Sequence, residues 1–364
     1  IDICIYMLFV FLKPFNSIPL LPPDIKLETN KVLEQLAASH WYLAELKRNS
    51  QTIAEKSVLI NTFAFREAKT SSAIENIITT YNELFMSDLF PDQIESPAAN
   101  AVNRYAKALI QGFNLIKKDK LLTGNKIIEI QKVLQDNDTG VRKIPATVLK
   151  NSKTGDTIFT PPDDPGAITE AFGNLEKYIN DKEFHKVDPL IKMAVIHYQF
   201  ETIHPFFDGN GRTGRIMNVL YLVLNNLLEM PVLYLSRFII ENKADYYELL
   251  NEVRTKNNWG GWVMFILIAV QITAMDGIIL INHMKALMND YKIKIKSKLP
   301  KIYSQDLLNL LFRHPYTKIE YVMNDLKVTR ITATKYLNQL TDNGLLTKHK
   351  LGRNIYFVND SLFD

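Results

Sequence analysis

The stretch from His204 to Arg215 limits the possible folds most, because it places a loop rich in glycine and charge between two apolar helical segments. Before it, apolar residues recur at helical spacing from Pro189 onward. That helix should end at His204, because the residue before a proline is disfavoured in the helical region. After it, a strongly apolar run predicts a second, buried helix that begins near Asn210. The charged residues therefore lie in a turn at a helix N-terminus.

This turn has the chemistry of an anion site. Free backbone N–H groups and the positive end of the helix dipole favour an anion at a helix N-terminus, and Gly209 and Gly211 let a phosphate approach the main chain closely. Asn210 can donate to a phosphate oxygen. Arg212 and Arg215 share one face of the helix and can bind further phosphates. The pattern predicts a binding site for a nucleotide polyphosphate.

Two residues of the turn add reactive chemistry. His204, which Pro205 should hold in an extended conformation, has a suitable ordinary pKa to take a proton from a hydroxyl at neutral pH. Asp208 is a hard oxygen ligand suited to a Mg²⁺ ion that bridges phosphates. The alternative is a helix cap with one satisfied core histidine, but the glycines, the aspartate and both arginines together favour a catalytic loop.

These residues match the signature of the Fic family at every specified position, and the chain resembles that family. The resemblance implies that His204 is the base, that Asp208 holds Mg²⁺, and that Phe206 is a buried wedge that sets the angle of the loop. It implies that the phosphates of ATP are bound by Gly209, Asn210, Gly211, Arg212, Thr213, Gly214 and Arg215. AMP would then be transferred from Mg²⁺-ATP to a Ser, Thr or Tyr hydroxyl of a protein, including the chain itself.

The segment 70–76 has two interpretations. Ser72 and Glu75 form a Ser-x-x-Glu capping box, which predicts the start of a helix. The segment also matches the inhibitory motif that the Fic resemblance implies, Ser/Thr-x-x-x-Glu-Gly/Asn, through Ser71, Glu75 and Asn76. In that family the glutamate pairs with the second arginine of the loop, here Arg215, and blocks the position of the ATP γ-phosphate. We expect the inhibitory role, and both interpretations can hold together.

The rest of the chain up to the loop is mainly helical in its pattern. After a proline-rich extended arm, apolar spacing predicts helices over 30–46, 53–63, 97–118 and beyond Thr123. Two β-prone runs at 147–149 and 157–159 are joined by a polar loop with a glycine, which predicts a small hairpin. The hairpin can be surface decoration. The Fic resemblance instead implies a flap that aligns the target segment by strand addition and includes Thr157, Ile158 and Phe159.

After the loop, residues 236–254 predict a mixed helical segment that carries Tyr246 and Tyr247. The resemblance implies that this pair lies near the adenine and ribose, and the alternative is an ordinary pair of interface aromatics. Residues 262–281 form the most apolar long run, but polar residues such as Gln271 and Asp276 interrupt it. We expect a buried core helix there and no membrane span.

The C-terminal part differs in charge. Residues 291–353 contain 13 Lys and Arg against 4 Asp and Glu, a net charge of +9, so the remainder of the chain is at −5. The lysines between 292 and 301 predict a solvated linker, which three short helices and a hairpin follow. This order resembles a winged helix-turn-helix, with a recognition face formed by Thr332, Thr334, Lys335 and Asn338. Duplex DNA and a docked protein are equally open as partners.

The predicted fold is mainly α: a Fic-type helical bundle core with a small β-hairpin flap, plus a C-terminal winged helix-turn-helix domain. We divide the chain into an N-terminal arm with helices that include the inhibitory helix (1–96), a catalytic core (97–290), and a linker with the winged-helix domain (291–364). Residues 1–12 are a poor signal peptide and too short to span a membrane, and a single cysteine, Cys4, suits a reducing compartment. We expect a cytoplasmic protein and leave homodimer formation open.

The activity that the resemblance implies is that of a Mg²⁺-ATP-dependent protein adenylyltransferase, inhibited by Glu75. Two related activities stay open: use of another nucleotide donor, and removal of AMP with the help of the inhibitory glutamate. Arg215 favours a donor with a γ-phosphate. A rival of another class is a DNA-binding regulator whose core senses a nucleotide.

Overall fold

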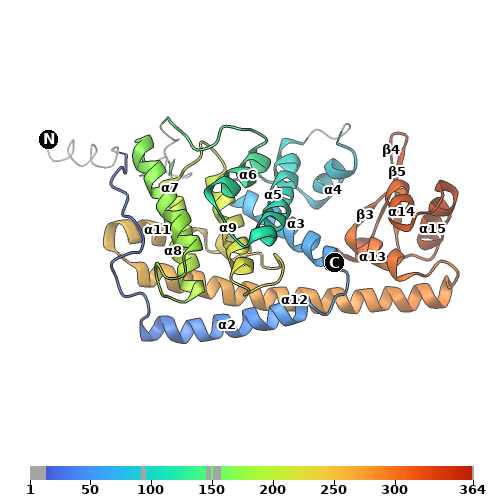
Figure 1. Cartoon of the computed structure of the whole chain (residues 1–364). Helices are drawn as coiled ribbons and strands as arrows, with labels where there is room; N and C mark the ends of the chain where they lie inside the picture. Colours follow the sequence, from blue (N-terminus) through green and yellow to red (C-terminus); the bar gives the residue numbers. More distant parts are fainter. Residues whose placement is uncertain (1–13, 92–95, 145–148, 151–156, 363–364) are drawn as a thin grey trace.

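A computed structural model describes residues 14–91, 96–144, 149–150 and 157–362. The described chain is mainly helical, as the sequence predicts, with two small antiparallel sheets (Figure 1). The helices before the loop are α2 (Asn30–Ser50), α3 (Lys56–Ile74), α4 (Tyr81–Leu89), α5 (Pro97–Asp119), α6 (Gly124–Gln135), α7 (Pro165–Asn180) and α8 (Pro189–Ile203). Those after it are α9 (Asn210–Leu224), α10 (Ser236–Glu241), α11 (Lys243–Lys256), α12 (Trp259–Lys298), α13 (Gln305–Arg313), α14 (Ile319–Leu326), α15 (Arg330–Asp342) and the short 3₁₀ helix η1 (Asp360–Leu362).

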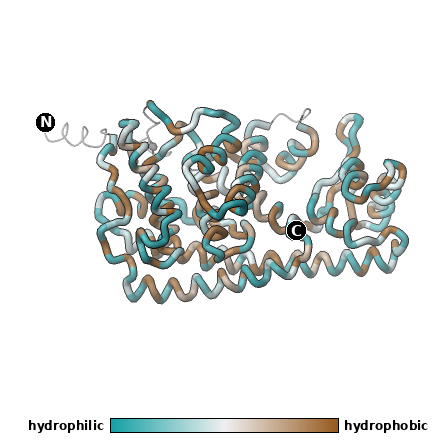
Figure 2. The backbone as a smooth tube through the Cα atoms, in the orientation of Figure 1, coloured by the Kyte–Doolittle hydropathy of each residue, from teal (hydrophilic) through white to brown (hydrophobic). Residues whose placement is uncertain are grey.

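Helices α8 and α9, which flank the loop, form the centre of the core. Asp188 caps α8 and Pro189 occupies its first turn, and nearly every residue of the helix is buried. A helix that is apolar on all sides is stable when other helices surround it, and α8 packs against α7, α9 and α12 while α9 also meets α5 and α6. Figure 2 shows apolar colour on the helices in the middle of the molecule, and also along the long helix α12 and in the C-terminal part. This packed centre fixes both ends of the loop.

Helices α2 and α12 lie side by side along one edge of the molecule (Figure 1). The Ser39 hydroxyl donates to the Leu267 carbonyl at 2.8 Å, and the side-chain amide of Gln35 donates to that of Gln271 at 2.5 Å. By length and composition alone, α12 could cross a membrane, and half of its most apolar window is buried within the protein.

The solvated linker predicted from residue 291 is wrong, because α12 continues to Lys298 and makes this connection helical. Tyr291 and Ile295 are buried on the side that meets the C-terminal unit, and the Tyr291 hydroxyl donates to the Leu345 carbonyl at 3.0 Å. Lys292 and Lys294 lie between these two residues along the helix, and Lys296 and Lys298 follow them. Tyr291 and Ile295 are four residues apart, which is the spacing of a helix with one buried side, and the prediction gave more weight to the many charges than to this spacing.

The capping-box interpretation of Ser72 and Glu75 is also wrong. Helix α3 begins at Lys56, where the Glu55 side chain caps it, and ends at Ile74, so Ser72 lies inside its last turn. Glu75 is the C-cap residue. The segment therefore closes a helix instead of opening one, and it places Glu75 at the end of α3.

The predicted hairpin is present. Strand β1 (Leu149–Lys150) pairs antiparallel with β2 (Thr157–Phe159), while residues 147 and 148 of the first predicted run lie outside the described residues. Phe159 is buried, with its ring centroid 6.0 Å from that of Phe15 and 3.9 Å from the Arg254 guanidinium. These contacts attach one end of the hairpin to α11, the helix that carries Tyr246 and Tyr247.

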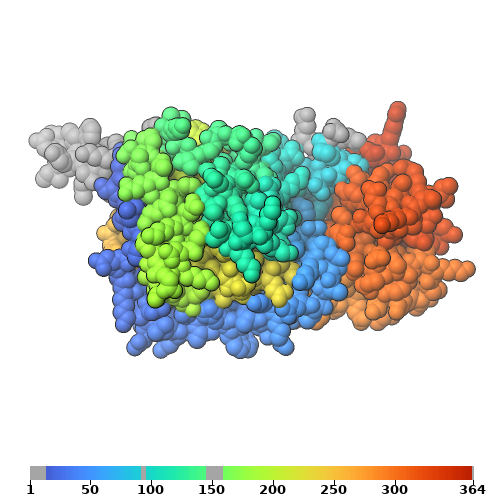
Figure 3. Space-filling view, in the orientation of Figure 1, coloured from blue at the N-terminus to red at the C-terminus, as the bar shows by residue number. Residues whose placement is uncertain are grey.

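The C-terminal unit contains α13, α14, α15 and a three-stranded antiparallel sheet in the order β3-β5-β4, formed by Tyr316–Thr317, Asn354–Val358 and Thr347–Leu351. It packs against α3 and α4, and Figure 3 shows it joined to those helices along one side. The rings of Tyr316 and Phe85 stack with centroids 5.0 Å apart, and Arg313 Nη2 lies 3.6 Å from Glu55 Oε2. Buried apolar residues continue without a break from the central helices into this unit.

Candidate functional site

His204 closes α8 and begins the loop. Its backbone is left-handed, with φ 50° and ψ 57°, and its N–H donates to the Phe200 carbonyl at 2.9 Å. The extended conformation predicted for this residue is therefore wrong. The preference set by Pro205 is overridden because a left-handed residue after a helix lets its N–H satisfy one of the last free carbonyls.

Phe206 and Asn210 set the path of the loop. Phe206 is fully buried, and its ring meets those of Phe172 and Phe200 at centroid distances of 6.3 and 6.1 Å. Asn210 Oδ1 accepts from the Phe206 N–H at 2.8 Å, and Asn210 Nδ2 donates to the Phe206 carbonyl at 2.7 Å. Both polar ends of this side chain are used within the loop. Donation from the Asn210 side chain to a phosphate stays a prediction, and its backbone N–H at the start of α9 is a second group that can meet an anion.

Two glutamines of α6, which the sequence pattern did not single out, support the glycine turn. Gly209 has φ 79°, a conformation that favours glycine. With its amide oxygen turned toward the loop, Gln135 accepts from the Gly209 N–H at 3.2 Å and from Arg212 Nη2 at 2.7 Å. Gln131 Nε2 donates to the Asp208 carbonyl at 3.4 Å. No local spacing links these residues to a loop so much later in the chain.

The imidazole of His204 is held in its neutral form. Its pKa is lowered to about 4, first because the ring is removed from water and next because the charge of Arg142 is near. Arg142 Nε donates to the His204 carbonyl at 2.7 Å, and the Arg142 N–H donates to the Pro205 carbonyl at 2.9 Å. A neutral imidazole is the form that can accept a proton from a hydroxyl. Arg142 is another site residue that the sequence pattern missed.

Glu75 lies in the anion site itself. Arg212 Nε donates to Glu75 Oε2 at 2.7 Å, and Arg215 Nη2 donates to Glu75 Oε1 at 2.8 Å. A Cβ atom on Gly211 would lie 2.7 Å from Glu75 Oε1. The carboxylate therefore occupies the space over the first turn of α9 that the glycine keeps open. The pairing with Arg215 was expected, and the structure adds Arg212 as a second partner.

Ser71, one turn before Glu75, completes the contact with Arg215. Arg215 is buried, and it donates from Nε to the Ser71 hydroxyl at 2.6 Å and from Nη2 to the Ser71 carbonyl at 3.0 Å. Thr213 is buried, and Gly214 packs so closely on α8 that a Cβ atom would lie 2.7 Å from Glu201 Oε1. Of the predicted phosphate ligands, Thr213 is buried and Gly214 packs on α8, while Gly211 and the two arginines contact Glu75.

The two tyrosines of α11 occupy different positions. Tyr246 is buried and its hydroxyl lies 2.8 Å from His197 Nε2, beneath the start of α9. The pKa of His197 is lowered to about 3, first by burial and next by the charge of Arg215. Tyr247 is half-buried, with its ring centroid 5.1 Å from that of Tyr246. Tyr246 therefore supports the loop from below, and Tyr247 is the member of the pair with access to solvent.

Asp208 has the chemistry expected for a Mg²⁺ ligand. Its side chain is 67% exposed on the loop, and its Oδ1 accepts from the Gly209 N–H at 2.7 Å. Mg²⁺ is commonly bound by one or two carboxylates together with substrate phosphates and waters. A single exposed carboxylate beside an anion site fits that pattern. Within the described ranges, no three His, Cys, Asp or Glu side chains gather as a metal site of their own.

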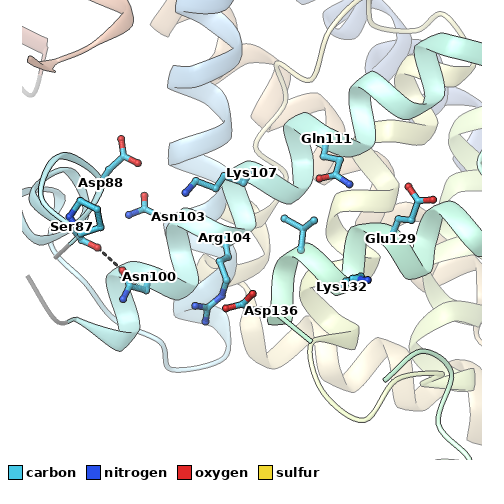
Figure 4. A pocket seen from close by; sticks show the side chains of 12 residues that line it. Ser87, Asp88, Asn100, Asn103, Arg104, Lys107, Gln111, Glu129, Lys132 and Asp136 are labelled. Carbon is cyan, nitrogen blue, oxygen red and sulfur yellow. Dashed lines mark hydrogen bonds between the residues drawn. The ribbon is translucent and has the colours of Figure 1, made fainter. Parts of the chain in front are cut away.

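A separate groove of about 800 Å³ lies between α4, α5 and α6 (Figure 4). Helix α6 borders both sites, since Gln131 and Gln135 contact the loop while Lys132 and Asp136 line the groove. The charged lining residues balance in sign: Arg104, Lys107 and Lys132 against Asp88, Glu129 and Asp136. Without excess positive charge the groove is a poor polyphosphate site, and the anion chemistry remains at the loop.

Three family models match the chain. "Fic/DOC family N-terminal" matches residues 33–114, "Fic/DOC family" matches 121–222, and "Protein adenylyltransferase SoFic-like, C-terminal domain" matches 287–362. Among curated proteins, the chain is 33% identical over 93 residues to "Protein adenylyltransferase fic-1" of Caenorhabditis elegans, covering 26% of this chain and 17% of the relative. It is 28% identical over 141 residues to "Protein adenylyltransferase Fic" of Aedes aegypti, covering 38% and 26%. These matches thus span about a quarter or less of the relatives' lengths.

Solved structures agree with the fold. A Fic family protein from Desulfovibrio desulfuricans G20 has a TM-score of 0.58 and 18% identity, and the match covers 93% of this chain and 98% of that one. Fic-1 (residues 134–508) from C. elegans has a TM-score of 0.53 and 19% identity over 70% of this chain and 73% of the other. At such identities the likeness concerns the fold alone.

Proposed function

The chain belongs to the Fic/DOC family, and on that premise we propose that it is a protein adenylyltransferase that transfers AMP from Mg²⁺-ATP to a Ser, Thr or Tyr hydroxyl of a protein, including itself. The observation that carries the proposal is the loop between α8 and α9. Between His204 and Arg215 it places a neutral imidazole, a carboxylate, and a helix N-terminus with two arginines. The names of the relatives support the same reaction.

Each group of the loop has a part in such a transfer. The backbone at the start of α9 and the arginines bind and orient the phosphates, so that the α-phosphate faces the incoming hydroxyl. His204 takes the proton of that hydroxyl as the new P–O bond forms and pyrophosphate leaves. Asp208 would hold Mg²⁺, which neutralises phosphate charge when it is bound. Tyr247 and the flap residues Thr157, Ile158 and Phe159 are proposed to contact the nucleotide base and the target segment.

We further propose that Glu75 inhibits the reaction. Its carboxylate lies against Gly211 and pairs with both arginines of the loop, at 2.7 and 2.8 Å. A phosphate in that space would face a negative charge at van der Waals distance and would find both arginines already paired. ATP would therefore bind poorly, or bind with its α-phosphate turned away from attack.

The decisive test of the activity is His204→Ala. The variant should lose AMP transfer by about 10²- to 10⁴-fold, the usual effect of losing a general base, while its ATP affinity changes little because the phosphate contacts lie elsewhere. The measurement is incorporation of label from α-labelled ATP into protein. His283→Ala, on the exposed surface of α12, is the matched control. Transfer at the native rate by His204→Ala would remove the assignment.

The pH profile gives a second check on His204. Because its pKa in the folded protein is about 4 and its ordinary value is 6.5, the base stays unprotonated well below neutral pH. The rate should therefore show no half-loss near pH 6.5 while the protein is folded. In the window between the two values the unfolded chain binds more protons than the folded one, so His204 contributes a loss of stability as the pH falls through that window.

For the C-terminal unit we propose a winged helix that binds duplex DNA. The feature that favours DNA is a row of exposed basic residues on the hairpin β4–β5, beside the exposed start of α15: Lys348, His349, Lys350 and Arg353. Thr332, Thr334, Lys335 and Asn338 of α15 would form the recognition face. A protein partner for this unit is the alternative.

A single cysteine in the chain favours a cytoplasmic location, and homodimer formation stays a proposal without a surface assigned to it.

A further inference from the structure

The end of α3 is closed by a specific pair of backbone hydrogen bonds. The Ile77 N–H donates to the Ser72 carbonyl and the Asn76 N–H to the Ala73 carbonyl, both at 3.0 Å, and Asn76 is left-handed with φ 61°. This is the Schellman arrangement, which satisfies two of the last free carbonyls of a helix. It leaves the carbonyl of Ile74, directly before Glu75, without a backbone partner in the part of the chain that the structure describes.

The side chain of Lys243 forms a hydrogen bond with that carbonyl. Its Nζ donates to the Ile74 carbonyl at 2.5 Å, and among the described residues this is the one hydrogen bond that the ammonium makes. The contact joins α11 to the end of α3, two elements far apart in the chain. A cation there also lies at the negative end of the α3 dipole, where it is favourable.

The position of Lys243 within its own helix indicates that the lysine serves the contact with α3. Lys243 is the first residue of α11, whose N-cap Asn242 makes no side-chain cap. A cation at a helix N-terminus is unfavourable for that helix. The stability of α11 therefore does not explain this lysine, whereas its contact with α3 does.

We propose that Lys243 is a positioning residue that holds the end of α3, and with it Glu75, against the loop in the inhibited state. The inference rests on the proposed function and assigns part of its regulation to a residue outside the Ser71–Asn76 motif. Burial lowers the pKa of Lys243 and the charge of Arg215 lowers it further, while Glu75 opposes this, which agrees with a place beside the ion-pair cluster. Without the ammonium, the last turn of α3 loses a charged donor and opens more often.

The test compares four proteins in one transfer assay with α-labelled ATP: the native chain, Lys243→Met, Glu75→Gly and the double variant. Methionine keeps the length of the side chain and removes the charge. Loss of one charged hydrogen bond should raise the open fraction on the order of tenfold, so Lys243→Met should raise transfer by about that factor. In the Glu75→Gly background the same change should have no effect, because the inhibitory carboxylate is already absent.

Two control variants and two further measurements separate this role from others. Lys243→Arg keeps a charged donor and should restore inhibition, and Lys256→Met, on the same helix with its Nζ paired to Glu252, should leave the rate unchanged. Amide exchange at Asn76 and Ile77 should be faster in Lys243→Met, since their hydrogen bonds close this turn. Equal melting temperatures of Lys243→Met and Lys256→Met would show that the change is local.

The outcomes are distinct. A Lys243→Met rate equal to the native rate, with Glu75→Gly active, overturns the inference and leaves the proposed function standing. The inference is also overturned if Lys243→Met lowers the transfer rate by the same factor in the native chain and in Glu75→Gly, because Lys243 would then bind substrate. If Glu75→Gly itself transfers no AMP at any ATP concentration, the proposed function fails instead.

Discussion

Replacement of Glu75 is the perturbation whose size can be worked out most directly. Its carboxylate accepts two charge-assisted hydrogen bonds, from Arg212 at 2.7 Å and from Arg215 at 2.8 Å. Hydrogen bonds to charged groups contribute about 1.5–3 kcal/mol each. Since the side chain is 25% exposed, the lower value applies, and the pair contributes about 3 kcal/mol. At about 1.4 kcal/mol for each factor of ten, Glu75→Gly should raise AMP transfer on the order of 10²-fold.

Glu75→Gln gives an intermediate point on the same scale. Glutamine keeps the length and one acceptor oxygen but removes the charge, so about half of the stabilisation should remain and transfer should rise on the order of tenfold. The assay is the initial rate of label transfer from α-labelled ATP at a concentration below saturation. The affinity for ATP should rise from the native chain to Glu75→Gln and then to Glu75→Gly. The affinity for ADP, which lacks the γ-phosphate, should change less.

Two controls make the result interpretable. Glu34→Gln, an exposed carboxylate on α2, should leave the rate unchanged. Arg215→Ala added to Glu75→Gly should abolish the gain, because the freed arginine is needed for the productive pose of the nucleotide. If Glu75→Gly and Glu75→Gln melt like the native protein and transfer AMP at the native rate, the reasoning from the two ion pairs is refuted.

Two other predictions follow from backbone conformation and surface charge. Asn76→Gly should preserve inhibition because glycine accepts φ 61°, whereas Asn76→Val should raise transfer, since a β-branched residue is strained there by about 1–2 kcal/mol; equal rates in the two variants would contradict the role of the turn. Replacing Lys350 and Arg353 together with glutamine should weaken binding of duplex DNA and reduce its salt dependence in a mobility-shift assay, with Lys26→Gln in the N-terminal arm as control. Absence of salt-dependent binding by the native chain would leave a docked protein as the partner of the C-terminal unit.

The sequence predicted the features that depend on neighbours in the chain. The spacing of apolar residues before His204 and after Asn210 located both helices, because the apolar residues of a buried helix recur at a regular spacing in the sequence. The match of Asn76 to the inhibitory motif also has a local cause: the turn after α3 needs a residue that tolerates a left-handed backbone. Such requirements appear directly as residue types at fixed spacing.

The features that it missed depend on contacts between distant segments. The missed contacts reach the loop or the end of α3 from separate helices and loops, through side chains common on any surface: Gln135, Arg142 and Lys243. The error over Ser72 and Glu75 has a local origin instead. A Ser-x-x-Glu pattern favours a helix start only when no helix precedes it, and here α3 had already run from Lys56. The helix that already includes Ser72 decided which of the two meanings applied.

Helix α3 connects the loop to the C-terminal unit. At one end Glu75 lies against Gly211 and the arginines of the loop, and at the other Glu55 lies 3.6 Å from Arg313 of α13. Between these ends α3 packs on α5 and α13, beside a cavity of about 170 Å³ that residues of α3, α12 and α13 line together. A helix in a close-packed core moves as one body more readily than it bends. A displacement of the C-terminal unit that carried α13 with it would therefore shift the same helix that presents Glu75, and we expect the inhibition proposed for Glu75 to respond to the position of that unit.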